Sequence, residues 1–333
     1  MNYRELGQTG IKISEIGFGA WGIGGPTPGP TSYGETDDKQ SMVALERALE
    51  KGINFFDTSA VYGYGHSEKL IGEAFHNKRD QVVIATKAGL DTYGKAPDFS
   101  VANLERSLSQ SLQRLKTDYI DLFQLHNPSE ETLLNGDKIQ DFAERQIAKG
   151  TIRAFGLSLR GPEDCHSAIE KFSPAALQIN FNLLDQRIID HGVMTLAERA
   201  KVSLIARTPL CFGFLTGALT VDTQFDPADH RSRWPRVQIE NWVNLARQMY
   251  ASANDNPAQT ESQFALRYPL SFSAITSTIP GIFSAEEVDI NAAASDMGSL
   301  SEEELTKVSA IFCAAEDFEN ADIEDPGKVE VHG

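Results

Sequence analysis

The chain of 333 residues is 41% hydrophobic and 23% charged, enough for one large α/β domain or two smaller ones. Its 47 acidic and 30 basic residues give a formal net charge of −17 with no basic cluster, which argues against nucleic acid and anionic membranes as partners. No apolar run approaches the ~20 residues of a membrane-spanning helix, and the N-terminus has no secretory leader, so we expect a cytoplasmic location.

The predicted elements alternate along the chain between short apolar or β-branched runs and longer amphipathic stretches. A hairpin comes first, because YRELGQTGIKISEI turns at residues 8–10. Eight strands are then expected at 15–21, 53–58, 81–87, 119–126, 151–158, 176–182, 202–207 and 274–280. Helices are expected between and after them at about 38–51, 67–78, 100–116, 138–149, 163–171, 188–200, 259–268 and 285–294.

Continuous apolar strands separated by helices are typical of a parallel sheet that is covered by helices. Eight such units fit one closed (β/α)8 TIM barrel. The alternative is an open doubly wound sheet, which usually has GxGxxG between its first strand and helix. The nearest glycine-rich stretch here, GFGAWGIGG, continues into a proline-rich loop where no helix can begin, so the sequence favours the barrel.

The barrel is expected to carry additions. The segment 208–258 after the seventh strand has the length of a functional loop and includes a predicted helix at 235–251. After the eighth unit, Ser301 and Glu304 make a capping box that opens a further helix to about Ala315. We therefore expect one barrel domain over residues 1–317, followed by an acidic, flexible tail at 318–333.

Consecutive strands are predicted to bring polar residues to one mouth, because active residues of such barrels follow the carboxyl ends of the strands. Asp57 follows the second strand, with Tyr62 in the loop behind it. Lys87 ends the third strand and His126 the fourth. A phenol is a poor acid or base near neutrality, and a nearby ammonium, held by a carboxylate, would lower its pKa. Each residue can also be structural, but together they suggest proton transfer to a carbonyl oxygen.

Other chemistries find less support in the sequence. Cys165, Cys211 and Cys313 have no CxxC spacing, so they fit inert thiols in a reducing cytoplasm better than a disulfide framework. The seven histidines show no HExxH or paired spacing, so no metal site is expected.

The sequences around the four polar residues resemble the aldo-keto reductases, from Tyr3 to about Ala294. The motif GINFFDTSAVYGYGHSEKLIGEA at 52–74 is very specific, as are ATKAG at 85–89 and DLFQLHNP at 121–128. The resemblance implies that the catalytic tetrad of the family falls on Asp57, Tyr62, Lys87 and His126. It also implies a nicotinamide cofactor and a small carbonyl or alcohol substrate.

The resemblance further implies contacts to the cofactor, with some departures from the family pattern. Ser158 matches the serine of a Ser-Asn pair that holds the nicotinamide carboxamide, whereas Leu159 replaces the asparagine. Gln178 matches the glutamine that binds the same carboxamide. Arg207 stands where many members stack a tyrosine on the nicotinamide, and a guanidinium can also stack, with an ion pair as the alternative. The other implied contacts are Trp21, Leu210, Gly213, Leu215, Ser277, Ile279, Gly281 and Asn291.

The eighth-strand motif STIPGIFSAEEVDIN departs from the family at the adenosine end of the cofactor. Ser284 and Glu287 make a capping box for a helix whose N-terminus is expected to meet that end. Members that use NADPH have an Arg or Lys just after the Pro-Gly, where this chain has Ile282 and Phe283. A missing cation costs a 2′-phosphate a charge-assisted contact of about 1.5–3 kcal/mol. The family favours NADP(H) and this departure favours NAD(H), so both cofactors stay open.

The sequence thus predicts an NAD(P)(H)-dependent oxidoreductase that moves a hydride between nicotinamide C4 and an aldehyde, ketone, alcohol or sugar, with Tyr62 as the general acid/base. Trp21, Tyr33, Tyr64 and Trp234 are candidates for the wall of the substrate pocket, with ordinary packing as the alternative. The other readings are a nicotinamide-binding regulatory subunit without significant turnover and a different barrel enzyme, such as an isomerase or aldolase. The oligomeric state stays open.

Overall fold

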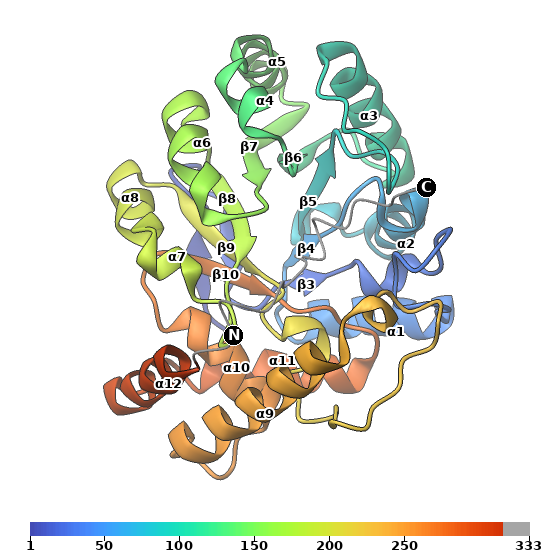
Figure 1. The fold of residues 1–333 in the computed structure, drawn as a ribbon. Coiled ribbons are helices and arrows are strands. Elements are labelled where there is room, and N and C mark those ends of the chain that lie inside the picture. Colours follow the sequence, from blue (N-terminus) through green and yellow to red (C-terminus); the bar gives the residue numbers. More distant parts are fainter. Residues whose placement is uncertain (316–333) are drawn as a thin grey trace.

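Eight parallel strands form one sheet, in the order β3 to β10, in the computed structural model, which describes residues 1–315 (Figure 1). The sheet closes on itself, because Gly17 N donates to Thr278 O and Gly19 N to Pro280 O, each at 2.8 Å. The strands are β3 (Phe18–Gly19), β4 (Phe55–Asp57), β5 (Val83–Ala88), β6 (Ile120–His126), β7 (Ile152–Ser158), β8 (Ala176–Asn180), β9 (Ser203–Arg207) and β10 (Ile275–Ile279). The predicted (β/α)8 barrel is confirmed.

Helices surround the barrel, as Figure 1 shows. They are α1 (Asp38–Glu50), α2 (His66–Phe75), α3 (Val101–Arg114), α4 (Glu130–Leu134), α5 (Asp137–Ala148), α6 (Cys165–Phe172), α7 (Arg187–Asp190), α8 (Val193–Ala200), α9 (Arg236–Ala253), α10 (Glu261–Leu270), α11 (Ala285–Asp296) and α12 (Glu302–Ala314). The helix expected at 188–200 is two helices, because Gly192 between them has a φ of +66°. The predicted capping box of Ser301 and Glu304 opens α12. The tail expected at 318–333 lies outside the described residues.

Two apolar layers hold the barrel together. Inside it, residues such as Phe55, Leu122 and Ile205 form a small cluster that fills the space between the strands. Outside it, a much larger cluster packs the other face of the strands against the helices. Because both faces of each strand are buried, the strands read in the sequence as continuous apolar runs.

The N-terminal hairpin, β1 (Tyr3–Glu5) and β2 (Lys12–Ser14), closes the amino end of the barrel. Its Leu6, Ile11 and Ile13 belong to the cluster inside the barrel. Gly7 N donates to Ser203 Oγ, at the start of β9, at 2.7 Å. The strands therefore open only at their carboxyl ends.

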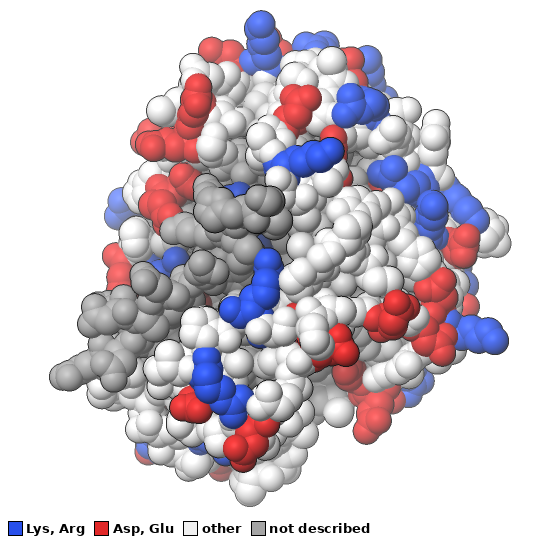
Figure 2. Space-filling model, turned by 45° about the vertical axis from the view of Figure 1, so that its right-hand side comes forward, with Lys and Arg blue, Asp and Glu red and all other residues white. Residues whose placement is uncertain are grey.

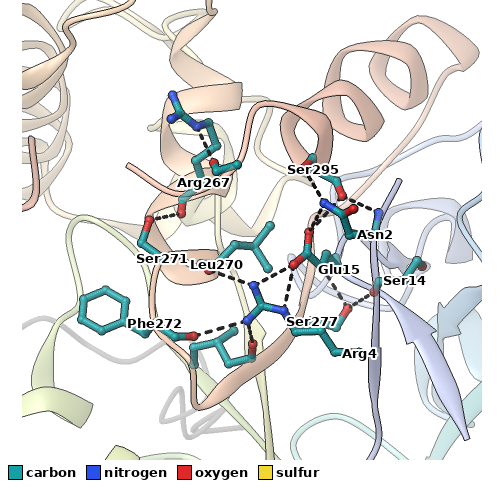
Figure 3. Close-up of polar contacts among 12 residues, drawn as sticks. Asn2, Arg4, Ser14, Glu15, Arg267, Leu270, Ser271, Phe272, Ser277 and Ser295 are labelled. Carbon is teal, nitrogen blue, oxygen red and sulfur yellow. Dashed lines mark hydrogen bonds and ion pairs between the residues drawn. The ribbon is translucent and has the colours of Figure 1, made fainter. Parts of the chain in front are cut away.

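Polar contacts fix this hairpin to the last barrel unit (Figure 3). Arg4 donates to the Glu15 carboxylate at 2.8 Å and to the carbonyl oxygens of Leu270 at 3.1 Å and Ile275 at 2.6 Å. Glu15 also accepts from Ser295 Oγ at 2.9 Å. The buried charge of Glu15 is thereby satisfied on several sides, so the closed end is rigid.

Blue and red residues are interspersed over the face shown in Figure 2, and no continuous positive surface forms there. Within residues 1–315, no helix is long and apolar enough to cross a membrane.

Candidate active site

A cavity of about 1000 Å³ opens at the carboxyl ends of the strands, opposite the hairpin. Asp57, Tyr62 and His126 line it, and the loops after β3, β5, β9 and β10 supply most of its walls. This volume is at the upper end of the range for small-molecule and cofactor sites. The cavity therefore has room for a dinucleotide together with a small substrate.

The side chain of Lys87 is fully buried beneath this cavity and uses all three of its protons. Its Nζ donates to Asp57 Oδ1 at 2.5 Å, to Thr58 O at 2.9 Å and to Tyr62 Oη at 3.1 Å. The other carboxylate oxygen of Asp57 accepts from the amide of Gln178 at 2.7 Å. Since Tyr62 Oη accepts from Lys87, its own proton is left for a group in the cavity.

The pKa of the Tyr62 phenol differs in direction from the sequence-based expectation. Burial raises this pKa well above its ordinary value and Asp57 raises it further, whereas Arg207 lowers it. Burial also lowers the pKa of Lys87, against the opposing effect of Asp57. The expected lowering of the Tyr62 pKa is therefore wrong, because burial outweighs the nearby cations. The phenol is held in its protonated form.

His126 lies beside Tyr62, with ring centroids 5.9 Å apart and the rings nearly perpendicular. Its Nδ1 lies 3.0 Å from Ser59 Oγ. Burial holds the pKa of His126 well below its ordinary value, and the positive charge of Lys87 lowers it further. The imidazole is therefore neutral near pH 7.

Of the two residues expected to bind the carboxamide, Gln178 and Ser158, only one lines the cavity. Gln178 lines the cavity. Ser158 is fully buried beside it and is absent from the lining, because its hydroxyl donates to Gln178 Oε1 at 3.3 Å. Ser158 therefore supports the position of Gln178, and its expected direct contact with the carboxamide stays a prediction.

Arg207, Leu210 and Gly213 line the cavity as the sequence led us to expect. Arg207 donates to Leu159 O at 2.8 Å, and its buried Nε has no partner among residues 1–315. The Leu215 side chain is 3% exposed and packs in the outer core, and the expected contact of its backbone with the cofactor diphosphate stays a prediction.

Beyond β10, Ile279, Gly281 and Asn291 line the cavity. Ser277 is absent from that lining, and its expected contact with the cofactor stays a prediction. This side chain is fully buried, and its hydroxyl donates to Ser14 O at 2.8 Å (Figure 3). Ser277 lies two residues before the end of the strand, so it fastens the hairpin.

The segment after Gly281 presents an acidic group to the cavity. Ser284 caps α11, accepting from Glu287 N, but the predicted capping box is only half formed because the Glu287 carboxylate accepts from Phe283 N. Glu287 lines the cavity and accepts from Phe283 N at 2.6 Å. Burial raises the pKa of this carboxyl group. None of the residues that 279–291 contributes to the lining is a Lys or Arg.

Two of the four expected wall aromatics are in place. Trp21 and Tyr33 line the cavity with ring centroids 5.0 Å apart. Tyr64 is 41% exposed and lies outside the lining. Trp234 is buried behind the wall, 5.1 Å from the Phe212 ring. The alternative of ordinary packing applies to Trp234.

Sequence reasoning missed several lining residues. Asn127 lies one residue after His126, and Arg160 lies two residues after Ser158. Both would have been found if the first two residues after each strand had been included as candidates. Tyr93, in the loop after β5, has no motif around it and carried no signal.

Within the described part of the chain, no three His, Cys, Asp or Glu side chains lie together in a way that could hold a metal ion. Cys165 and Cys211 are buried free thiols whose pKa values are raised by burial, and Cys313 is an exposed one.

Comparison with known proteins is consistent with this geometry. The model of the "Aldo/keto reductase family" matches residues 15–312. The chain belongs to this family. It is 33% identical to "Aldo-keto reductase YhdN" of Bacillus subtilis over 81% of each chain, and 30% identical to "Aldo-keto reductase yakc [NADP(+)]" of Schizosaccharomyces pombe over 72% of this chain and 70% of that one. The solved glycerol dehydrogenase of Gluconobacter oxydans is similar in fold, with a TM-score of 0.79, 28% identity and coverage of 93% of this chain and 95% of that one.

Membership in the family makes the protein an aldo-keto reductase, an enzyme of NAD(P)H-dependent carbonyl reduction. Its relatives use NADP(H) or NADH. Substrates typical of the family are small carbonyl compounds.

Proposed function

We propose that the protein transfers a hydride between C4 of a nicotinamide and the carbonyl carbon of an aldehyde or ketone, or the corresponding carbon of an alcohol or sugar, with Tyr62 as the general acid/base. The observation that carries the proposal is the 3.1 Å contact in which Lys87 Nζ donates to Tyr62 Oη. It turns the phenolic proton towards the cavity. The bound nicotinamide supplies or accepts the hydride, and the side chains of the chain handle the proton.

Asp57, Lys87 and His126 take distinct roles in this proposal. Asp57 holds Lys87, whose ammonium compensates negative charge on Tyr62 when its proton leaves. A His126 tautomer that accepts from Ser59 at Nδ1 carries its proton on Nε2 and donates it to the substrate oxygen. The raised pKa of Tyr62 keeps the phenol protonated at neutral pH, so the proton that carbonyl reduction consumes is present.

The residues that would hold the cofactor are those of the expected set that reach the cavity. They are Trp21, Gln178, Arg207, Leu210, Gly213, Ile279, Gly281 and Asn291. The buried Nε of Arg207 has no partner among the described residues and therefore fits an acceptor or a planar ring of the cofactor. The donor set thus fits a nicotinamide dinucleotide.

NAD(H) is the cofactor that the far end of the cavity favours. Glu287 stands in the lining beyond Gly281, where a 2′-phosphate would need a cation. A carboxylate repels a phosphate and accepts hydrogen bonds from ribose hydroxyls. The cation Arg231 also lines the cavity, but it is already held by Asp229 at 2.6 Å.

The test of the proton chemistry is Tyr62→Phe. Because this variant loses only the hydroxyl, we expect cofactor binding to persist while kcat/KM for aldehyde reduction falls by about 10²–10⁴. Nicotinamide absorbance measures the rate, and fluorescence titration with NADH and with NADPH measures binding, with the tighter complex expected for NADH. Turnover like that of the wild type in Tyr62→Phe would contradict the assignment.

The second candidate is a nicotinamide-binding regulatory subunit. The wild-type protein distinguishes the two functions in a broad aldehyde panel. Tight cofactor binding without turnover of any aldehyde would favour the regulatory subunit, and turnover would exclude it. We also propose a cytoplasmic location, supported by the two buried free thiols, Cys165 and Cys211, which fit a reducing compartment.

A further inference from the structure

Two neighbouring strands end in buried polar atoms that lack a partner. Asn127 follows β6 and is 7% exposed, and its Oδ1 has no hydrogen bond within residues 1–315. Arg160 follows β7, and its Nε is likewise buried without a partner in that part of the chain. Both residues line the cavity. Buried polar groups are almost always paired, and a ligand in the cavity can supply the partner that both atoms lack among residues 1–315.

The backbone holds the two residues next to each other. His126 pairs with Ser158 across β6 and β7, and Asn127 N donates to Ser158 O at 2.8 Å. Asn127 has a φ of +54°, a left-handed conformation that is uncommon outside glycine and recurs at functional sites. The backbone at the ends of β6 and β7 therefore fixes the positions of Asn127 and Arg160.

The charge of Arg160 is felt inside the site. It contributes to the low pKa of His126, so its guanidinium lies within electrostatic range of that imidazole. The acidic neighbour is Asp164, on whose pKa Arg160 has the weakest influence, after burial, Glu163 and Glu130. Within residues 1–315, the Arg160 side chain has no hydrogen-bonded counter-ion, although the chain has a formal charge of −17.

This wall is remote from the region proposed for the adenosine end. In the ring of eight strands, β6 and β7 lie four and three strands away from β10, which leads to Gly281 and Glu287. Asn127 and Arg160 therefore line the cavity near His126 and away from the region proposed for the adenosine end.

We propose that Arg160 binds an anionic group of the substrate, a carboxylate or a phosphate, while Asn127 Oδ1 accepts from a hydroxyl of the same molecule. The substrate class is then a hydroxylated carbonyl compound with an anionic group. This inference rests on the proposed function and deepens it, because it names the molecule that brings its carbonyl oxygen to Tyr62. A guanidinium suits either anion, since its planar fork matches both oxygen arrangements.

Paired aldehydes test the proposal. Succinic semialdehyde is compared with butanal for a carboxylate, and glyceraldehyde 3-phosphate with glyceraldehyde for a phosphate. The readout is the ratio of kcat/KM for the anionic aldehyde to that for its neutral partner, in which effects on Tyr62 and His126 cancel. We expect Arg160→Gln to lower this ratio by about 10- to 100-fold for the pair that carries the natural anion, the loss of one charge-assisted contact.

Matched variants separate a local contact from a change of net charge. Arg247→Gln removes one exposed cation on α9, far from the cavity lining, and should leave both ratios unchanged. Asn127→Asp keeps the shape of the side chain but gives Arg160 an internal counter-ion, so it should lower the ratio as well. A ratio in Arg160→Gln within twofold of the wild type, for both pairs, would overturn the inference.

A binding measurement makes the outcome independent of turnover. Calorimetric titration of the protein, saturated with NADH, uses succinate or inorganic phosphate as the probe. Binding that weakens about tenfold or more in Arg160→Gln, and not in Arg247→Gln, supports the anion site. Equal binding in all three proteins overturns it. Turnover of neutral aldehydes with unchanged ratios defeats this inference alone, whereas no turnover of any aldehyde defeats the proposed function.

Discussion

The two ends of the barrel differ in whether their buried polar side chains have hydrogen-bond partners. At the closed end, Arg4 and Glu15 satisfy each other and the surrounding carbonyl and hydroxyl groups, and no buried side-chain polar atom of residues 1–16 is without a partner. At the open mouth, Asn127, Arg160 and Arg207 each have a buried polar atom without a partner in the described part of the chain. Satisfied networks fix a structure, whereas orphan groups keep their binding capacity for a ligand. Substitutions at the two ends should therefore affect different measurements.

Lys87→Met should have the largest effect, because one substitution removes the ammonium from both Tyr62 and Asp57. We expect kcat/KM to fall by about 10²–10⁴. The free energy of unfolding should fall by about 3–5 kcal/mol, since Asp57 stays buried without its partner. Steady-state kinetics and urea denaturation measure the two losses. In the double variant with Asp57→Leu, stability should recover and activity should not; recovery of activity would refute the role of Lys87.

Acidification should destabilise the mouth through His126 and His230. Burial keeps the pKa of His126 well below 6.5 and lowers that of His230 to about 3, so the unfolded chain binds protons first as the pH falls below 6.5. Stability that is present above pH 6.5 is then lost, by about 1.4 kcal/mol for each histidine at pH 5.5. Denaturant unfolding at pH 7.5 and 5.5 measures the loss. In His230→Phe, the loss of unfolding free energy between pH 7.5 and 5.5 should be about half that of the wild type. A variant that loses as much as the wild type would refute the role of His230.

Arg4→Met tests the closed end. We expect the free energy of unfolding to fall by about 2 kcal/mol, because Glu15 and the carbonyl oxygens of Leu270 and Ile275 lose their donor. The values of kcat and KM should stay those of the wild type. Urea denaturation and steady-state kinetics measure the separation. If Arg4→Met has the stability of the wild type but a different kcat, the closed end contributes to catalysis and not to stability, which contradicts the prediction.

Glu287→Lys should have the smallest effect, on cofactor choice alone. Replacing the carboxylate at the wall by a cation should improve NADPH binding relative to NADH by about tenfold. Fluorescence titration with both cofactors measures this. Glu286→Lys is the matched control, because it makes the same change on an exposed neighbouring side chain and should leave the preference as it is. Equal shifts in the two variants would mean that net charge, and not the position of Glu287, decides the preference.

The sequence predicted the barrel, its hairpin and its strand ends because each of these depends on local patterns. Asp57, Lys87 and His126 were found because the end of a buried strand is visible as the end of an apolar run. The sequence did not show that Leu215, Ser158 and Ser277 lie outside the cavity lining, because the family motif gives the position of a residue along the chain but not the direction of its side chain. Ser277 donates to Ser14, which lies 263 positions away in sequence, and no local pattern contains that contact.

By itself, the sequence determined the alternation of strands and helices, the resemblance to the family and the polar residues at the carboxyl ends of the strands. These follow from the alternation of apolar strands and amphipathic helices, which any window of the chain contains. Only the tertiary structure decided which groups have partners and which do not. The pKa of Tyr62 rises because burial outweighs nearby charges, and Arg160 lacks an ion-pair partner because no carboxylate of residues 1–315 packs close enough to pair with it. Both depend on distances between segments that are remote in the sequence.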